Sequence, residues 1–350
     1  MVVTVLSGAT VFLAAGCVPP PAPPSPPVID LFSVTAGDLT APGLVPFAWN
    51  VRDPNGDTLT CRFDDDGDGT WDEIITPCTG AGGRTASADE GVHTARLEVS
   101  DGVHAPVTSS AAYHVAAGPT ETFDIVTRFV GTEDPRVTAA VGDAVDRWMA
   151  VLARGVPDTT VHHAQGNCLG DLIPSFDGIV DDIVIDVIVT PVPGLSGDAS
   201  WCVLGDDGLP RLSFVRINPV GLDWLHDNGQ LTDLVTHEVG HALGIGTAAP
   251  WGTLTQYLGE SDGYAFTGPR AVAEWQHLGG IGTAVPLSRT ADHWDETSLQ
   301  NELMTCWLEF VPTHPTSAIT VAALADLGFH VDVDAADPWT VPQEPGLATC

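Results

Sequence analysis

The sequence has 350 residues, of which 44% are hydrophobic, enough for two folded domains and a tether. Its 46 acidic residues stand against 12 basic ones, all Arg, and give a formal net charge of −34. A surface of that sign repels nucleic acid and anionic membranes, so we exclude both as direct partners.

The first 17 residues predict export from the cytoplasm. Residues 2–16 are uncharged and mostly apolar, too short for a membrane-spanning helix and typical of a signal peptide. Small residues before Cys17 resemble the bacterial lipoprotein signal, in which that cysteine carries the lipid. An ordinary cleaved signal with an incidental cysteine is the alternative. We expect an extracytoplasmic protein, either an outer-membrane or cell-surface lipoprotein held only by its lipid anchor, or a secreted one.

A tether and disulfides are expected next. Residues 18–27 are rich in Pro and predict a stiff spacer. Six cysteines remain besides Cys17, an even number in an exported chain, which predicts disulfides. Fifteen pairings are conceivable. We expect the sequential one: Cys61 with Cys78, Cys168 with Cys202, and Cys306 with Cys350.

Residues 28–117 predict a small all-β sandwich. Short apolar runs alternate with turn signals such as Asp53-Pro54-Asn55-Gly56 and Asp101-Gly102. The segments 49–57 and 91–102 resemble polycystic-kidney-disease-type (PKD) or related immunoglobulin-like modules. That resemblance implies a spacer domain on a bacterial surface enzyme.

One turn of this domain carries closely spaced acidic residues. Asp64, Asp66, Asp68 and Gly69 match the opening of a calcium loop, in which alternate carboxylates converge on one cation. The twelfth position, normally Glu, is Ile75, which is not a ligand. The sequence therefore leaves two interpretations open, a Ca²⁺ site or an acidic Asp-Gly hairpin turn.

Residues 121–350 predict a second, mixed α/β domain. Asp134-Pro135 opens a helix whose apolar residues follow helical spacing. Another helix begins after Asp227-Asn228-Gly229. Apolar runs at 122–130, 179–189 and 212–217 predict strands between and before these helices.

The second helix contains His237-Glu238-Val239-Gly240-His241. Residues i and i+4 lie on one helix face, so both imidazoles can bind one metal ion, and Glu238 can serve as general base to a metal-bound water. The alternative is a buried helix with two hydrogen-bonded histidines. Glu260, nineteen residues after His241, imitates the third zinc ligand of thermolysin-like enzymes.

Gly244 favours another class of zinc peptidase. A Gly three residues after the second His suits the left-handed turn that ends the helix in metzincins. The compact metzincin pattern then requires His at position 247, which is Thr247. Leishmanolysin places a long insertion there, and Ala291-Asp292-His293-Trp294 with Asn301-Glu302-Leu303-Met304-Thr305 resembles the third-ligand and Met-turn segments of that family. The resemblance extends over residues 120–340.

The leishmanolysin resemblance implies an α+β metzincin-type catalytic domain with one catalytic zinc. The ligands would be His237, His241 and His293, with Met304 beneath the metal, Glu238 as base, and 212–217 as the edge strand that pairs with peptide substrate. His277 is a rival third ligand. Cys168 is a candidate zinc-blocking thiolate of a latent form, although a disulfide fits the even cysteine count better.

The sequence thus predicts a surface-tethered zinc endopeptidase acting on proteins or peptides. Two other functions stay open: a surface adhesin or calcium-binding spacer protein with an inactive peptidase-like domain, and a metal-dependent hydrolase of non-peptide substrates.

Overall fold

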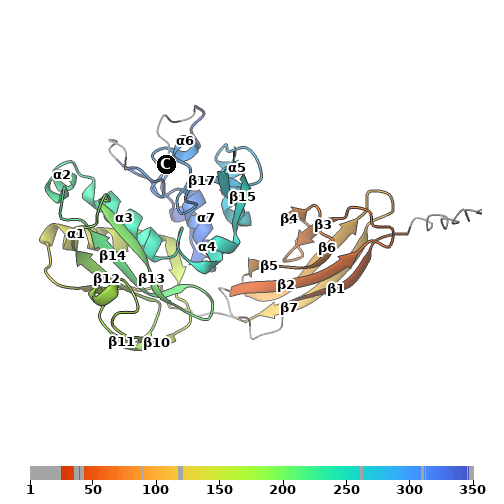
Figure 1. Ribbon diagram of the computed structural model, residues 1–350, viewed down its shortest axis with the longest axis horizontal. Helices are drawn as coiled ribbons and strands as arrows, with labels where there is room; N and C mark the ends of the chain where they lie inside the picture. The colour runs from red at the N-terminus through yellow and green to blue at the C-terminus, as the bar shows by residue number, and fades with distance from the viewer. Residues whose placement is uncertain are drawn as a thin grey trace, which may run out of the picture.

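The computed structural model describes residues 25–34, 39, 43–88, 90–116, 121–260, 263–308, 311, 313–344 and 346. The predicted signal peptide, Cys17, most of the Pro-rich tether and Cys350 lie outside these residues. Among the described helices, none combines the length and the apolar run needed to cross a bilayer. The chain forms a β-sandwich followed by a mixed α+β part (Figure 1).

The first part is the predicted sandwich of two antiparallel sheets. One sheet has the order β1 (Val28–Val34), β2 (Gly43–Arg52), β5 (Gly80–Ala88). The other has the order β4 (Glu73–Ile75), β3 (Thr60–Asp64), β6 (Gly91–Ser100), β7 (Val107–Val115). Alternate residues of β2 and β6 are buried between the sheets, as expected for strands with one solvated face.

The second part is built on a four-stranded sheet in the order β13 (Gly197–Leu204), β14 (Pro210–Ile217), β12 (Ile183–Val189), β8 (Ile125–Phe129). The last three strands are parallel, and β13 is antiparallel to β14. Helices α1 (Pro135–Val151) and α3 (Leu231–Ala242) pack together over one face. The hairpin β10 (Thr159–His163) and β11 (Phe176–Val180) packs on the other face through Val161 and Val180 (Figure 1).

The predicted edge strand is wrong. Residues 212–217 belong to β14, which lies between β13 and β12 and is buried along almost its whole length. Both of its faces are covered, so its apolar run reflects a central strand and not a half-exposed edge. The edge strand beside α3 is β13.

The chain between α3 and the C-terminus forms a smaller subdomain. Helix α4 (Ala249–Thr253) leads into the antiparallel sheet β15 (Thr255–Gly259), β16 (Gly263–Phe266), β17 (Val285–Leu287). Helices α5 (Pro269–His277), α6 (Glu296–Leu299) and the almost fully buried α7 (Ala318–Leu327) complete it. The remaining elements are short: α2 (Leu222–Asp227), the pair β9 (Leu152–Arg154) and β18 (His330–Val331), and 3-10 turns at Gly170–Leu172 and Val333–Ala335.

Two predicted disulfides, Cys61–Cys78 and Cys168–Cys202, are confirmed. The second leaves Cys168 without a thiolate for a metal. Cys306 is also disulfide-bonded, whereas its predicted partner Cys350 lies outside the described residues. Disulfides of this kind persist in oxidising compartments, which indicates an extracellular or secreted protein.

Candidate metal centre

Helix α3 carries His237 and His241 one turn apart, with both rings nearly buried. The helix lies in the core, and all its residues from Leu234 to Ala242 are buried, including the apolar Leu234, Val235 and Val239. The indole of Trp148 on α1 donates to the carbonyl of Thr236 at 2.8 Å. This packing holds the two histidines against rotation of the helix.

Gly244 ends α3 in the predicted left-handed turn, with φ of 112°. The amide of Ile245 donates to Gly240 at 3.1 Å and that of Gly244 to His241 at 3.0 Å, the two bonds of a Schellman motif. The same turn directs the carbonyl of Ile245 back to His241, whose Nδ1 donates to it at 2.8 Å. The turn therefore both stops the helix and orients one imidazole.

Gly246 lets the distant third histidine segment approach this turn. It has φ of 73°, and a Cβ on it would lie 2.1 Å from the carbonyl oxygen of Asp292. Only a residue without a side chain allows this approach of the two backbones. The chain leaves the turn at Thr247, forms the small subdomain, and returns to deliver His293 beside His241.

The three histidines converge through their Nε2 atoms. The distances are 3.0 Å between His237 and His241, 3.0 Å between His241 and His293, and 3.2 Å between His237 and His293. A tetrahedral zinc bound at about 2.0–2.1 Å sets its ligand nitrogens about 3.3–3.4 Å apart. The spacing and the donor type both fit one zinc ion.

The second nitrogen of each ring identifies the tautomer. Nδ1 of His237 donates to the carbonyl of Leu303 at 2.7 Å, and Nδ1 of His293 donates to the carboxylate of Asp292 at 2.8 Å. Nδ1 of His241 donates to the carbonyl of Ile245, as described above. Carbonyls and carboxylates only accept, so each neutral ring carries its proton on Nδ1. The Nε2 atoms then present three lone pairs to one point, an arrangement that could hold one metal ion.

Burial keeps the rings of His237 and His241 neutral. It lowers the pKa of His241 to about 3, helped by the neighbouring His293. Burial likewise lowers the pKa of His237 well below its usual value, together with the other two rings. Burial alone would raise the pKa of Asp292, but the hydrogen bond and charge of His293, together with the hydrogen bond from Thr290, lower it overall. Neutral imidazole is the form that binds metal.

Glu238 lies next to the ligand set and is also buried. No described residue hydrogen-bonds its Oε2 atom. Burial, and to a lesser degree the charge of Asp198, raises the pKa of Glu238 to about 8. A buried carboxyl with one free oxygen is unfavourable for stability, and such groups concentrate where proton transfer is needed.

Met304 forms the apolar floor under the helix. It is fully buried, and a Cβ on Gly240 would lie 2.7 Å from its sulfur, so the sulfur touches the α3 backbone between the two histidines. The backbone carbonyl of Met304 accepts from Trp294 at 3.0 Å. The Met turn and the His293 segment are therefore joined directly.

The histidines open into a cleft of about 460 Å³. The edge strand β13 lines one side with residues Gly197 to Ala199, and α2 contributes Trp224. The segment after the Met turn lines the other side with Trp307 and Leu308. No Arg lines the cleft among the described residues.

The rival third ligands lie elsewhere. Glu260 follows β15 and does not belong to the group of side chains that converges on the histidines. His277 ends α5, has a 78% exposed side chain and contacts Glu274.

The acidic turn of the sandwich differs from the predicted calcium loop. The carboxylates that approach one another belong to Asp64, Asp66 and Asp72; Asp68 does not join them and accepts from the amide of Thr70. Asp64 accepts from the amides of Gly67 and Gly69. Asp72 approaches from β4's side of the hairpin, a tertiary contact that the linear spacing does not contain. These internal bonds shape an acidic turn in which three carboxylates converge, and both interpretations, a Ca²⁺ site and a hairpin turn, stay open.

Sequence reasoning missed three residues of the centre. Gly246 makes room for the His293 segment, and Asp292 binds the His293 ring. Gly197 on β13 faces Glu238, because a Cβ there would lie 2.7 Å from Glu238 Oε1. The role of Asp292 could have been predicted, because it is the acidic neighbour of a candidate ligand. No sequence pattern predicts the contacts of the two glycines.

Comparison with known proteins finds similarity to PKD domains. No family model matches the chain, and no curated protein matches it. The PKD domain of an M14-like peptidase from Thermoplasmatales archaeon SCGC AB-540-F20 is 22% identical and matches 27% of this chain and 98% of its own, with a TM-score of 0.23. The PKD1 domain of Vibrio anguillarum Epp is 21% identical over 27% of this chain and 99% of its own, with a TM-score of 0.21. The PKD domain of the human VPS10 domain-containing receptor SorCS2 is 15% identical over 33% and 96%, with a TM-score of 0.22.

Proposed function

We propose that this protein is an extracytoplasmic zinc endopeptidase with a leishmanolysin-like, metzincin-type catalytic domain. The observation that carries the proposal is the convergence of three Nε2 lone pairs within 3.2 Å beside a buried carboxyl. In this proposal the β-sandwich is a spacer, and lipid on Cys17 is the only membrane attachment.

His237, His241 and His293 would hold the ion, and their Nδ1 bonds keep the rings in the binding tautomer. Bound zinc would polarise the scissile carbonyl and lower the pKa of its water toward neutrality. Glu238 would accept the water's proton at its unpartnered Oε2 and return it to the leaving amine.

The cleft supports cleavage within a chain. A carboxypeptidase needs a cation for the terminal carboxylate, and no described residue that lines the cleft is an Arg, while the sequence has no Lys. Strand β13 is hydrogen-bonded within its sheet only to β14, so its outer edge can pair with an extended peptide. Trp224, Trp307 and Leu308 favour apolar side chains beside the scissile bond.

Zinc content and peptide cleavage of the mature chain test the proposal together. We expect about one zinc per chain, and casein cleavage that stops with a chelator and returns with zinc. Protein without zinc at neutral pH would contradict the metal centre. Bound zinc without cleavage of casein or a peptide library would favour the inactive adhesin, and cleavage of ester substrates alone would favour the non-peptide hydrolase.

A further inference from the structure

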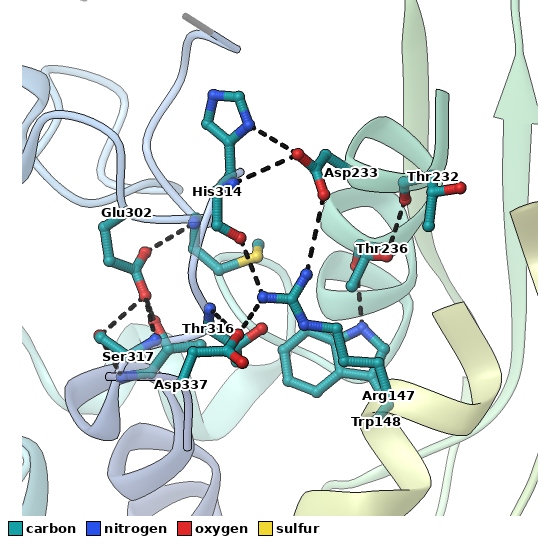
Figure 2. A network of polar contacts seen from close by, with 12 residues as sticks. Arg147, Trp148, Thr232, Asp233, Thr236, Glu302, His314, Thr316, Ser317 and Asp337 are labelled. Atoms are coloured by element: carbon teal, nitrogen blue, oxygen red, sulfur yellow. Dashed lines mark hydrogen bonds and ion pairs between the residues drawn. The ribbon is translucent and has the colours of Figure 1, made fainter. Parts of the chain in front are cut away.

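Glu302, two residues before Met304, is a fully buried carboxylate that takes no part in the proposed chemistry. Its Oε2 accepts from the amide of Met304 at 2.6 Å. Its Oε1 accepts from Ser317, through the amide at 3.1 Å and the hydroxyl at 2.8 Å, and from the Thr320 hydroxyl at 2.5 Å. Figure 2 shows Glu302 above Ser317 at the start of α7. Burial raises the pKa of Glu302, and the four donors and a helix N-terminus offset part of that effect.

Two short paths join this carboxylate to the candidate zinc ligands. Along the first, Glu302 holds the turn in which Leu303 presents its carbonyl to His237 Nδ1 at 2.7 Å. The amide of Leu303 itself donates to Pro315 at 2.9 Å, so the turn is held on both sides. Any rotation of the 302–304 turn would therefore withdraw the acceptor that orients the His237 ring.

The second path reaches the third histidine. The hydroxyl of Thr320 donates to Glu302 and accepts from the indole of Trp294 at 2.7 Å. Trp294 is fully buried, directly follows His293, and donates its amide to the carbonyl of Met304 at 3.0 Å. The position of His293 thus depends on the same carboxylate as the tautomer of His237.

We propose that Glu302 is the positioning residue of the metal centre, which sets the ring of His237 through Leu303 and the backbone of His293 through Thr320 and Trp294. The inference rests on the proposed zinc site. A residue so placed lowers the ligand reorganisation that metal binding requires, so its effect appears in zinc affinity. Groups that orient ligands from behind typically change metal affinity by about 10–100-fold.

Glu302→Gln tests this in the mature chain. The replacement keeps the shape, but whichever way the amide points, its NH₂ group meets a donor, either Met304 or the Ser317 and Thr320 pair. We expect the zinc dissociation constant, measured by competition with a chromogenic chelator, to rise about 10–100-fold. Thr320→Val cuts only the link to Trp294, and we expect a rise of roughly tenfold.

Asp326→Asn is the matched control. Asp326 lies on α7, the helix that also carries Thr320, and is 2% exposed. It accepts hydrogen bonds from the amides of Arg270 and Ala271 at 3.0 and 2.8 Å, and among the described residues no hydrogen bond joins it to a histidine of the candidate centre. The Asp326→Asn substitution should lower the melting temperature of the zinc-free protein and leave zinc affinity unchanged. Equal zinc affinity in wild type and Glu302→Gln, or equal losses in Glu302→Gln and Asp326→Asn, would overturn the positioning role.

The outcomes separate the two proposals. Wild-type protein that binds no zinc contradicts the proposed function and, with it, this inference. Wild-type protein that binds zinc, with variants that bind it equally well, contradicts the inference alone. Should Glu302→Gln fail to fold, unchanged zinc affinity in Thr320→Val refutes the role just as directly.

Discussion

Replacing Gly197 by Ala should damage catalysis without removing the metal. Gly197 lies on the edge strand β13 with its Cα facing the proposed general base. An added Cβ would lie 2.7 Å from Glu238 Oε1 and 3.0 Å from the carbonyl of Arg216, where ordinary contact begins at 3.4 Å. The carboxyl or the strand must therefore move by about 0.7 Å.

A shift of that size in an active site lowers the reaction rate, because misplacing a catalytic group by about 1 Å reduces the rate about 10²-fold. We expect kcat/KM for a peptide substrate to fall about 10–100-fold, or about 1.4–2.7 kcal/mol of transition-state stabilisation. Zinc content should remain at the wild-type level, since the three atoms nearest to the new methyl group belong to Glu238 and Arg216 and not to a ligand ring.

The assay pairs kcat/KM with zinc content, using Gly142→Ala as control. Gly142 is exposed on α1 with open space around its Cα, so Ala there should stabilise the helix by about 0.5–1 kcal/mol and leave activity alone. Gly197→Ala with kcat/KM within twofold of wild type would refute the placement of Glu238 against β13. Loss of zinc together with activity would show that the strand acts on the metal and not on the base.

Three further predictions concern the ligands and the base. His293→Ala should lose stoichiometric zinc while Glu260→Ala keeps it, as read by elemental analysis; the reverse would move the chain to the thermolysin-like class. Glu238→Gln should abolish turnover with zinc retained. In zinc-free protein, burial raises the folded-state pKa of Glu238 from 4.5 to about 8. The contribution of Glu238 to folding stability is therefore present at low pH and is lost as the pH rises through about 8. The difference in unfolding free energy, Glu238→Gln minus wild type, should therefore increase between pH 4.5 and 8. Denaturant titrations measure this difference, and a value that does not change with pH would contradict the burial of this carboxyl.

Much of the candidate centre could be predicted from local sequence patterns. The four-residue spacing of His237 and His241 puts both rings on one helix face whatever surrounds the helix. Gly244 ends that helix in a left-handed turn because only Gly adopts it without cost, and the structure has this turn. Alternating strands with Asp-Gly turns likewise predicted the sandwich, although β2 pairs with β5 and β3 with β6 across intervening strands.

Strand order was not readable in the same way. The run 212–217 looked like an edge strand, but its position between β13 and β12 depends on the cover that other segments provide on both faces. The set of carboxylates that converge in the acidic turn was not predictable either, since Asp72 joins Asp64 and Asp66 from across a hairpin and Asp68 does not.

The sequence by itself determined which reactive groups are present: two imidazoles and a carboxyl on one helix, a glycine to end that helix, and cysteines that pair. Tertiary structure alone decided the rest of the centre. Gly246 against Asp292, Gly197 against Glu238, and Glu302 between the Met turn and Trp294 are contacts between segments distant in the chain. Such contacts depend on how the whole core packs, and no local periodicity encodes them.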